Sequence, residues 1–217
     1  MIKYKSAVFD LDGTLLNTLD DLADGVNEAL THFGYPPRTV EEVRRFVGNG
    51  VRLLIVRALP MGEETPNFEE VHAYFRTYYA AHSMIKTAPY PGIIEMLTKL
   101  KENGMKIAVV SNKFDAAVKE LCKLYFGDLI DAAIGDLDPR PRKPAPDGTH
   151  AALRELGVSP EDAAFIGDSD VDILTARNAG LTPIGVLWGF RDRDCLEGAG
   201  AELLAQNADE LFSLLTE

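Results

Sequence analysis

Two carboxylates stand two residues apart at the end of the first apolar stretch of the chain. Ala7-Val8-Phe9 is a short run typical of a buried strand, and Asp10-Leu11-Asp12-Gly13-Thr14 follows it directly. Asp and Gly are common turn residues, so Asp12-Gly13 alone indicates no more than a turn. A carboxylate directly after a buried strand is costly, however, unless a partner compensates its charge. A divalent cation that prefers hard oxygen ligands, such as Mg²⁺, would do so.

A second acidic cluster, Gly167-Asp168-Ser169-Asp170-Val171-Asp172, follows another apolar run and opens a helical stretch. A helix N-cap explains one member of this cluster, and acidic residues suit the positive end of a helix dipole. Capping does not explain why Asp168 should meet Asp10 at one edge of a sheet. Convergent carboxylates favour a metal site, with Asp172 one helical turn further on.

Two weaker signals point to an anion. Ser111-Asn112-Lys113 follows the apolar run 107–110, and a hydroxyl with backbone N–H groups at the start of a helix makes an anion site. Lys143, in the loop Lys143-Pro144-Ala145-Pro146, can supply a point charge for a phosphate. Each signal is weak alone, since a lone lysine in a loop is usually a solvated charge.

Together the four segments predict phosphoryl chemistry. Asp10 can attack phosphorus in line, because a carboxylate is a competent nucleophile toward a phosphoryl group. Asp12 can protonate the leaving oxygen and then activate the water that cleaves the aspartyl-phosphate. Mg²⁺ and Lys143 would neutralise the oxygens of the transferring group.

The elements that must position these residues have the rhythm of an α/β fold. Continuous apolar runs suit strands covered on both faces of a parallel sheet, and they are found at 7–9, 107–110, 130–134, 163–166 and 183–187. Helical patterns separate most of them, which predicts a doubly wound, mostly parallel sheet. In open sheets of this kind, ligands bind outside the carboxyl ends of the strands, where Asp10, Ser111 and Asp168 are expected.

One stretch breaks the rhythm. No strand is expected from about Leu15 to about Ala88, and three amphipathic helical stripes run over residues 19–30, 51–58 and 68–82. This pattern predicts a helical insertion of roughly 70 residues with a small core of its own, able to move as a unit. The aromatic stripe of its last helix indicates core packing rather than a cofactor site.

Composition sets bounds on function. With 217 residues, the chain is long enough for one domain with a smaller insertion. Its 22 Lys and Arg against 34 Asp and Glu give a net charge of −12. An acidic surface repels phosphate backbones, so neither nucleic acid nor an anionic membrane is expected as a partner. A monomer or a homodimer remains open.

The remaining residue types add little chemistry. Cys122 and Cys195 cannot form a disulfide framework, and the four scattered histidines lack the spacing of a zinc motif. No apolar run approaches the roughly 20 residues of a membrane span, and the first residues do not resemble a signal peptide. A cytoplasmic enzyme is the expectation.

The ordered motifs Asp10-x-Asp12-x-Thr14, Ser111, Lys143 and Gly167-Asp168-x-x-x-Asp172 resemble the four motifs of the haloacid dehalogenase-like superfamily. The resemblance covers essentially the whole chain. It implies a Rossmann-like core of residues 1–15 and 89–217, with residues 16–88 as a mobile helical cap.

The resemblance also implies roles for single residues. Asp10 is the nucleophile and Asp12 the general acid and base. Mg²⁺ is bound by Asp10, by the backbone carbonyl of Asp12 and by Asp168, with support from Asp172. Phosphate is bound by Ser111, Asn112 and Lys143.

Among members of this superfamily, the residues favour the phosphoglycolate phosphatases. Dehalogenases lack the second aspartate of the first motif, which is present here as Asp12. Phosphonatases use a cap lysine to form a Schiff base, and the segment from Ser6 to Ile85 has no lysine. The Gly-x-Ser-Arg cap loop of β-phosphoglucomutases is replaced by Gly48-Asn49-Gly50, which resembles the cap loop of phosphoglycolate phosphatases and is a candidate substrate loop. Asn17-Thr18 departs from the Asp-Ser common in the family, at the expected hinge.

We therefore expect a Mg²⁺-dependent phosphatase of a small phosphate ester, with 2-phosphoglycolate as the favoured substrate. Alternatives are a phosphatase of a sugar phosphate, a nucleotide or pyrophosphate, then a mutase, then a non-catalytic binding module. Arg44, Arg45 and Arg52, near the candidate loop, suit solvated surface positions better than a substrate carboxylate.

Overall fold

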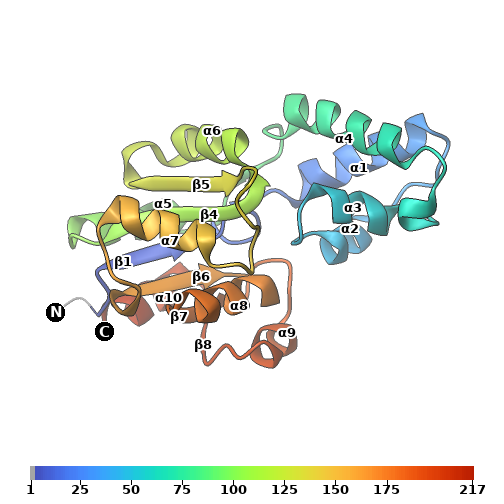
Figure 1. Ribbon diagram of the computed structural model, residues 1–217. Coiled ribbons are helices and arrows are strands. Elements are labelled where there is room, and N and C mark those ends of the chain that lie inside the picture. Colours follow the sequence, from blue (N-terminus) through green and yellow to red (C-terminus); the bar gives the residue numbers. More distant parts are fainter. Residues whose placement is uncertain (1–2) are drawn as a thin grey trace. The chain divides into compact units, whose positions relative to one another are not determined.

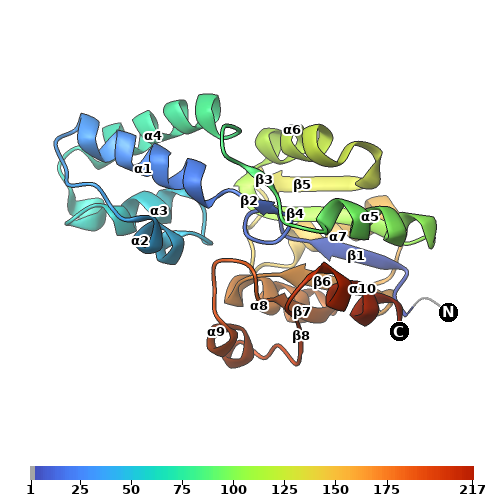
Figure 2. The ribbon, with the colours of Figure 1, turned by 180° about the vertical axis from the view of Figure 1, so that it is seen from behind.

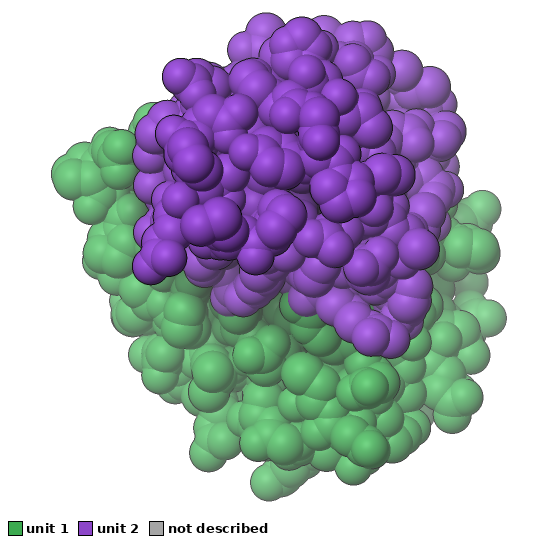
Figure 3. All heavy atoms as spheres, turned by 90° about the vertical axis from the view of Figure 1, so that its right-hand side faces the viewer, with its two compact units in different colours: residues 1–16, 89–217 green, residues 17–88 purple. Residues whose placement is uncertain are grey.

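The computed structural model describes residues 3–217, which divide into two compact units (Figure 3). The core unit contains the chain up to Leu16 together with Pro89–Glu217, and the helical unit contains Asn17–Ala88. The chain passes between them at two short strands, β2 (Leu16–Asn17) and β3 (Ala88–Pro89).

The core unit is built on a six-stranded sheet in which every neighbouring pair is parallel. The strand order is β5-β4-β1-β6-β7-β8. The bounds are β1 Ser6–Phe9, β4 Lys106–Phe114, β5 Ala132–Asp136, β6 Ala163–Gly167, β7 Thr182–Val186 and β8 Leu203–Ala205.

Strand β1 is apolar throughout because both of its faces are covered. Ala7 and Phe9 belong to one hydrophobic cluster, whereas Val8 between them belongs to another. Successive side chains of a strand point to opposite faces, so a strand buried on both faces needs an unbroken apolar run.

Helices cover both faces of this sheet. The cluster that contains Phe9 also contains residues of α5 (Ile93–Glu102), α6 (Asp115–Phe126) and α10 (Ala208–Thr216). The cluster that contains Val8 draws on α7 (Asp147–Leu156) and α8 (Asp170–Ala179). Figure 1 shows α7 and α8 in front of the sheet, and Figure 2 shows α5 and α10 in front of its other face. The predicted doubly wound α/β fold is confirmed.

The topology brings three strand ends together. β1 lies between β4 and β6, and all three run in the same direction. The chain leaves β1 toward β4 on one side and reaches β6 on the other, which makes the carboxyl end of β1 the switch point where such sheets bind ligands. Asp10 and Asp168 directly follow β1 and β6, whereas Ser111 lies within β4, three residues before the end of that strand.

The helical unit contains four α-helices and a small apolar core. They are α1 (Leu19–His32), α2 (Val40–Phe46), α3 (Val51–Ala58) and α4 (Phe68–His82). Each helix buries one face, and the core includes Val26, Leu30, Val43, Ile55 and Phe75. An α-helix that packs one face against a core buries residues three and four positions apart. This spacing of apolar residues is the pattern that predicts α1, α3 and α4.

Several elements differ from the sequence-based expectation. Helix α2, helix α9 (Arg193–Gly198), helix α10 and strand β8 were not predicted, and two-residue strands β2 and β3 lie at the ends of the stretch expected to contain no strand. Strand β4 continues to Phe114, four residues beyond the predicted end. Within residues 3–217, no helix is both long and apolar enough to cross a membrane.

Candidate active site

The first acidic residue of the site is fixed by the strand that precedes it. The Asp10 backbone N–H donates to the Ile166 carbonyl at 2.9 Å, so Asp10 extends the pairing of β1 with β6. Its side chain is buried. After it the chain turns at Gly13 (φ 91°), where a Cβ atom would lie 2.4 Å from Asp168 Oδ2. Only glycine combines this backbone conformation with so close an approach.

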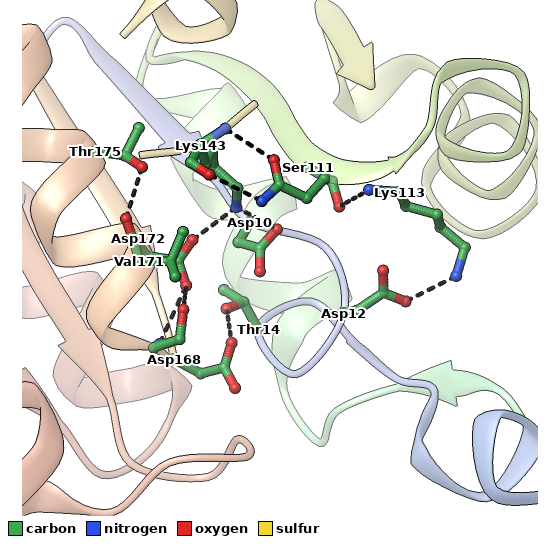
Figure 4. A network of polar contacts seen from close by, with 12 residues as sticks. Asp10, Asp12, Thr14, Ser111, Lys113, Lys143, Asp168, Val171, Asp172 and Thr175 are labelled. Carbon is green, nitrogen blue, oxygen red and sulfur yellow. Dashed lines mark hydrogen bonds and ion pairs between the residues drawn. The ribbon is translucent and has the colours of Figure 1, made fainter. Parts of the chain in front are cut away.

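Asp168 and Asp172 are positioned by β6 and by the first turn of α8. The Ser169 backbone N–H and hydroxyl donate to Asp172 Oδ2 at 3.1 and 2.6 Å. Thr14 Oγ1 donates to Asp168 Oδ1 at 3.2 Å, and the Phe190 N–H donates to Asp168 Oδ2 at 2.7 Å. Both carboxylates are therefore buried and oriented (Figure 4).

Lys143 joins the acidic residues, as Figure 4 shows. Its Nζ lies 2.8 Å from Asp10 Oδ1 and 2.6 Å from Asp172 Oδ1. The backbone of Lys143 is held in turn by Asn112, whose Oδ1 accepts from the Lys143 N–H at 2.8 Å and whose Nδ2 donates to the Lys143 carbonyl at 3.1 Å. Both the oxygen and the nitrogen of the Asn112 amide thus position the Lys143 backbone. That Asn112 and Lys143 bind phosphate stays a prediction.

Ser111 lies at the same edge, but not where it was expected. The sequence analysis placed Ser111 to Lys113 at the start of a helix; this is wrong, because β4 runs on to Phe114 and α6 begins at Asp115. The register of β4 against β5 shifts between Val110 and Phe114. The Ser111 hydroxyl accepts from the Lys113 N–H at 3.2 Å. Its role in binding phosphate stays a prediction.

The electrostatics of the cluster are those of a cation site. One carboxylate oxygen each from Asp10, Asp168 and Asp172 lie within 4.8 Å of one another. Burial raises the pKa of the Asp10 carboxyl well above its usual range, and the charge of Asp172 adds to this. Burial likewise raises the pKa of Asp168 to about 7, with the charge of Asp172 as the next cause. One lysine cannot neutralise three such groups.

Two observations show that the donor set fits a divalent cation. Asp10 Oδ1 is buried and accepts no well-aligned hydrogen bond, although Lys143 Nζ is near it as an ion pair. Burial alone lowers the pKa of Lys143, but the charges of Asp10 and Asp172 outweigh this effect and raise it above its usual range. Hard carboxylate oxygens in a deficit of positive charge are suitable ligands for Mg²⁺.

Asp12 lies apart from this cluster. Its Oδ1 pairs with Lys113 Nζ at 3.0 Å, on the side away from Asp168 and Asp172 (Figure 4). Burial, and then the charge of Asp12, raises the pKa of the Cys122 thiol on α6 to about 12. Cys122 therefore stays protonated at neutral pH.

Some residues of the site were missed by the sequence analysis. Thr14 belongs to the first motif and Lys113 to the segment Ser111-Asn112-Lys113, but the sequence predicts a partner for neither. The loop after β7 closes over the turn, since Trp188 Nε1 donates to the Thr14 carbonyl at 2.9 Å while the Phe190 N–H reaches Asp168. The glycine-rich stretch 185–190 was the available signal for this loop.

The candidate loop Gly48-Asn49-Gly50 belongs to the helical unit. Gly48 (φ 120°) and Gly50 (φ 85°) both adopt backbone conformations that favour glycine. Arg57 of α3 braces the loop, donating from Nη1 to the Phe46 carbonyl at 2.6 Å and from Nη2 to Asn49 Oδ1 at 2.8 Å.

The arginines near the loop have acidic neighbours in the same unit. Arg52 pairs with Glu63 and Glu69, each at 2.8 Å. Arg44 and Arg45 both pair with Glu41, at 3.5 and 3.3 Å. The expectation that these arginines are surface residues rather than substrate ligands stays a prediction.

Comparisons with known proteins point in one direction. Residues 7–186 match the family described as haloacid dehalogenase-like hydrolase. Phosphoglycolate phosphatase 1 of Pseudomonas aeruginosa is 36% identical over 218 residues, which cover 94% of this chain and 77% of that protein. Phosphoglycolate phosphatase of Mannheimia succiniciproducens is 36% identical over 196 residues, covering 87% and 88%.

Solved structures agree. The crystal structure of a candidate phosphoglycolate phosphatase from Lactobacillus delbrueckii subsp. bulgaricus has a TM-score of 0.95 at 36% identity and covers 99% of both chains. The structure of CbbY from Rhodobacter sphaeroides, in complex with xylulose-(1,5)bisphosphate, has a TM-score of 0.77 at 27% identity and covers 100% of both chains.

Proposed function

The chain belongs to the haloacid dehalogenase-like hydrolase family and is a phosphatase, and from that premise we propose that it hydrolyses 2-phosphoglycolate to glycolate and phosphate through an aspartyl-phosphate on Asp10. The observation that carries the proposal is the convergence of Asp10, Asp168, Asp172 and Lys143 at one edge of the sheet. The choice of 2-phosphoglycolate as substrate rests on the similar proteins that are named phosphoglycolate phosphatase.

The metal belongs to this proposal. Asp10, Asp168, the backbone carbonyl of Asp12 and, in support, Asp172 would hold Mg²⁺, whose charge would offset that of the buried carboxylates and of the phosphoryl oxygens. The cation would also favour the ionised form of the carboxyls whose pKa values burial raises.

The first step uses two aspartates. An Asp10 carboxylate oxygen attacks phosphorus, the new O–P bond forms, and the bond from phosphorus to the ester oxygen breaks. The electron pair of that bond remains on the ester oxygen, which takes a proton from the Asp12 carboxyl and leaves as glycolate. Lys143, 2.8 Å from Asp10, neutralises charge beside the attacking carboxylate.

The second step reverses the proton transfer. Asp12, now ionised, takes a proton from a water molecule whose oxygen attacks the phosphorus of the aspartyl-phosphate. The bond between phosphorus and the Asp10 oxygen breaks, releasing phosphate and restoring the Asp10 carboxylate. Asp12 ends protonated, as it began.

Substrate choice falls to residues 16–88, which we propose act as a cap over the core of residues 1–15 and 89–217. A cap excludes water from the reaction and places specificity residues against the leaving group. Within it, Gly48, Asn49 and Gly50 form the proposed substrate loop. A sugar phosphate is the second candidate substrate, because CbbY was crystallised with a sugar bisphosphate.

The test is phosphate release from a panel that contains 2-phosphoglycolate, sugar phosphates, nucleoside monophosphates and pyrophosphate, with Mg²⁺ or with a chelator. We expect Mg²⁺-dependent turnover confined to 2-phosphoglycolate and its loss by about 10⁴-fold or more in Asp10→Asn. Turnover of sugar phosphates alone would replace the substrate but keep the mechanism. A mutase would instead isomerise a sugar phosphate without release, and a binding module would retain ligand affinity in Asp10→Asn.

A further inference from the structure

Lys113 makes a second ion pair in the site, separate from that of Lys143. Its Nζ lies 3.0 Å from Asp12 Oδ1, and the Lys113 and Asp12 side chains are only 7% and 16% exposed. Asp10 and Asp12, which are two residues apart, thus form ion pairs with different lysines. Asp10 pairs with Lys143, and Asp12 pairs with Lys113.

This division has a geometric consequence. A cation bound among Asp10, Asp168 and Asp172 would otherwise attract the carboxylate of Asp12 as well. The pair with Lys113 holds this carboxylate on the side away from Asp168 and Asp172, as Figure 4 shows.

The Lys113 backbone is well placed for this task. Its N–H donates to Ser111 Oγ at 3.2 Å, and its carbonyl lies against Gly135 of β5, where a Cβ atom would come within 2.8 Å of the Lys113 oxygen. Lys113 also lies in the irregular part of β4, between Val110 and Phe114. The strand therefore presents the lysine from a fixed backbone position.

We propose that Lys113 is a positioning residue for Asp12: it holds the carboxyl group of the general acid clear of the metal carboxylates, oriented for proton transfer to the leaving oxygen. This rests on the proposed role of Asp12 in hydrolysis. An alternative is that Lys113 binds the substrate directly, and the two roles predict different kinetics.

A leaving-group comparison separates them. p-Nitrophenolate leaves without a proton, whereas an alkoxide such as that of glycolate requires one. With enzyme in excess over substrate and Mg²⁺ present, the release of the alcohol in a single turnover reports the first step alone. We expect Lys113→Met to slow glycolate release from 2-phosphoglycolate about 10- to 100-fold and p-nitrophenol release less than about threefold.

Two further variants complete the test. Lys113→Arg keeps the charge and should restore most of the rate on 2-phosphoglycolate. In an Asp12→Asn background, Lys113→Met should cause no further loss, because the group that it positions is gone. Lys119→Met is the matched control, since the exposed Lys119 pairs with Asp115 at 2.7 Å and its loss should leave both rates unchanged.

Three results would overturn the proposal: equal slowing of both leaving groups by Lys113→Met, a change confined to KM, or a full additional loss in the Asp12→Asn background. Should Lys113→Met fold poorly, Lys113→Arg alone decides, since a rate as low as that of Asp12→Asn in a stable protein contradicts it. Failure of the proposed function looks different, because Asp10→Asn would then retain release of both alcohols.

Discussion

The acidic site of the core unit and the Gly48–Gly50 loop of the helical unit are both braced by basic side chains, but under opposite conditions. Lys143 is buried between Asp10 and Asp172, whereas Arg57 holds the loop from an exposed position. A buried charge that loses its partner is strongly destabilising, while exposed pairs contribute little. Loss of the basic residue should therefore destabilise the acidic site strongly. The loop is held more weakly and can change its conformation more easily.

The largest loss of stability is expected for Lys143→Met in the acidic site. The substitution leaves Asp10 and Asp172 buried without their cation, so we expect the metal-free protein to lose about 3 kcal/mol or more in free energy of unfolding. Urea denaturation at neutral pH measures this loss. Mg²⁺ should restore part of it, because a ligand that binds only the folded state stabilises that state.

The matched control is again Lys119→Met, because the Lys119 side chain is 59% exposed and its pair with Asp115 should contribute less than about 1 kcal/mol. Equal losses in the two variants would show that burial does not distinguish the two lysines.

A second prediction sharpens the contrast through pH. The pKa of Asp168 is raised to about 7 by burial, and that of Asp10 is raised as well. A raised carboxyl pKa stabilises the metal-free fold fully below the unfolded-state pKa, and this stability is lost as pH rises through the folded-state pKa, here near 7. Mg²⁺ competes with these protons, so its stabilising effect should grow as pH rises through about 7.

The measurement is the Tm difference with and without Mg²⁺ at about pH 5 and about pH 8. Titrations elsewhere in the chain largely cancel in this difference. We expect a larger Mg²⁺ shift at the higher pH, and a weaker pH dependence in Asp168→Asn. A Mg²⁺ shift that is equal at both pH values would contradict the assignment of the buried carboxylates to a cation.

The same contrast explains how far sequence reasoning reaches. Strands β1 and β6 were predicted because burial on both faces requires unbroken apolar runs, and polar residues directly after such runs lie at the carboxyl edge. Strand β8 was missed because it spans only Leu203–Ala205, too few residues for a periodic signal. Ser111 was placed at a helix start because nothing in the local pattern shows that β4 continues to Phe114.

The partners of the site residues lay beyond the sequence for a different reason. Thr14 is 154 residues from the Asp168 that it contacts, and Lys113 is 101 residues from Asp12. Pattern and spacing rank which residues can do chemistry, but which side chain pairs with which depends on strand order and register. Arg57 and Asn49 are only eight residues apart in the sequence, yet their hydrogen bond depends on the conformation of the turn between α2 and α3. The sequence predicts only that this turn is a glycine-rich loop.

The smallest effect is expected at the exposed end of the comparison. Arg57→Met removes the bonds to the Phe46 carbonyl and to Asn49 Oδ1, so Gly48 to Gly50 sample more conformations. If this loop contacts substrate, KM for 2-phosphoglycolate should rise about three- to tenfold with little change in kcat, since the core unit holds the reacting groups. Arg193→Met is the control, because its exposed pair with Glu197 at 3.1 Å belongs to the core unit and not to the helical unit that contains the loop. A fall in kcat comparable to that of Asp12→Asn would instead mean that the loop takes part in the chemistry, and that the buried and exposed regions are not divided as their contacts indicate.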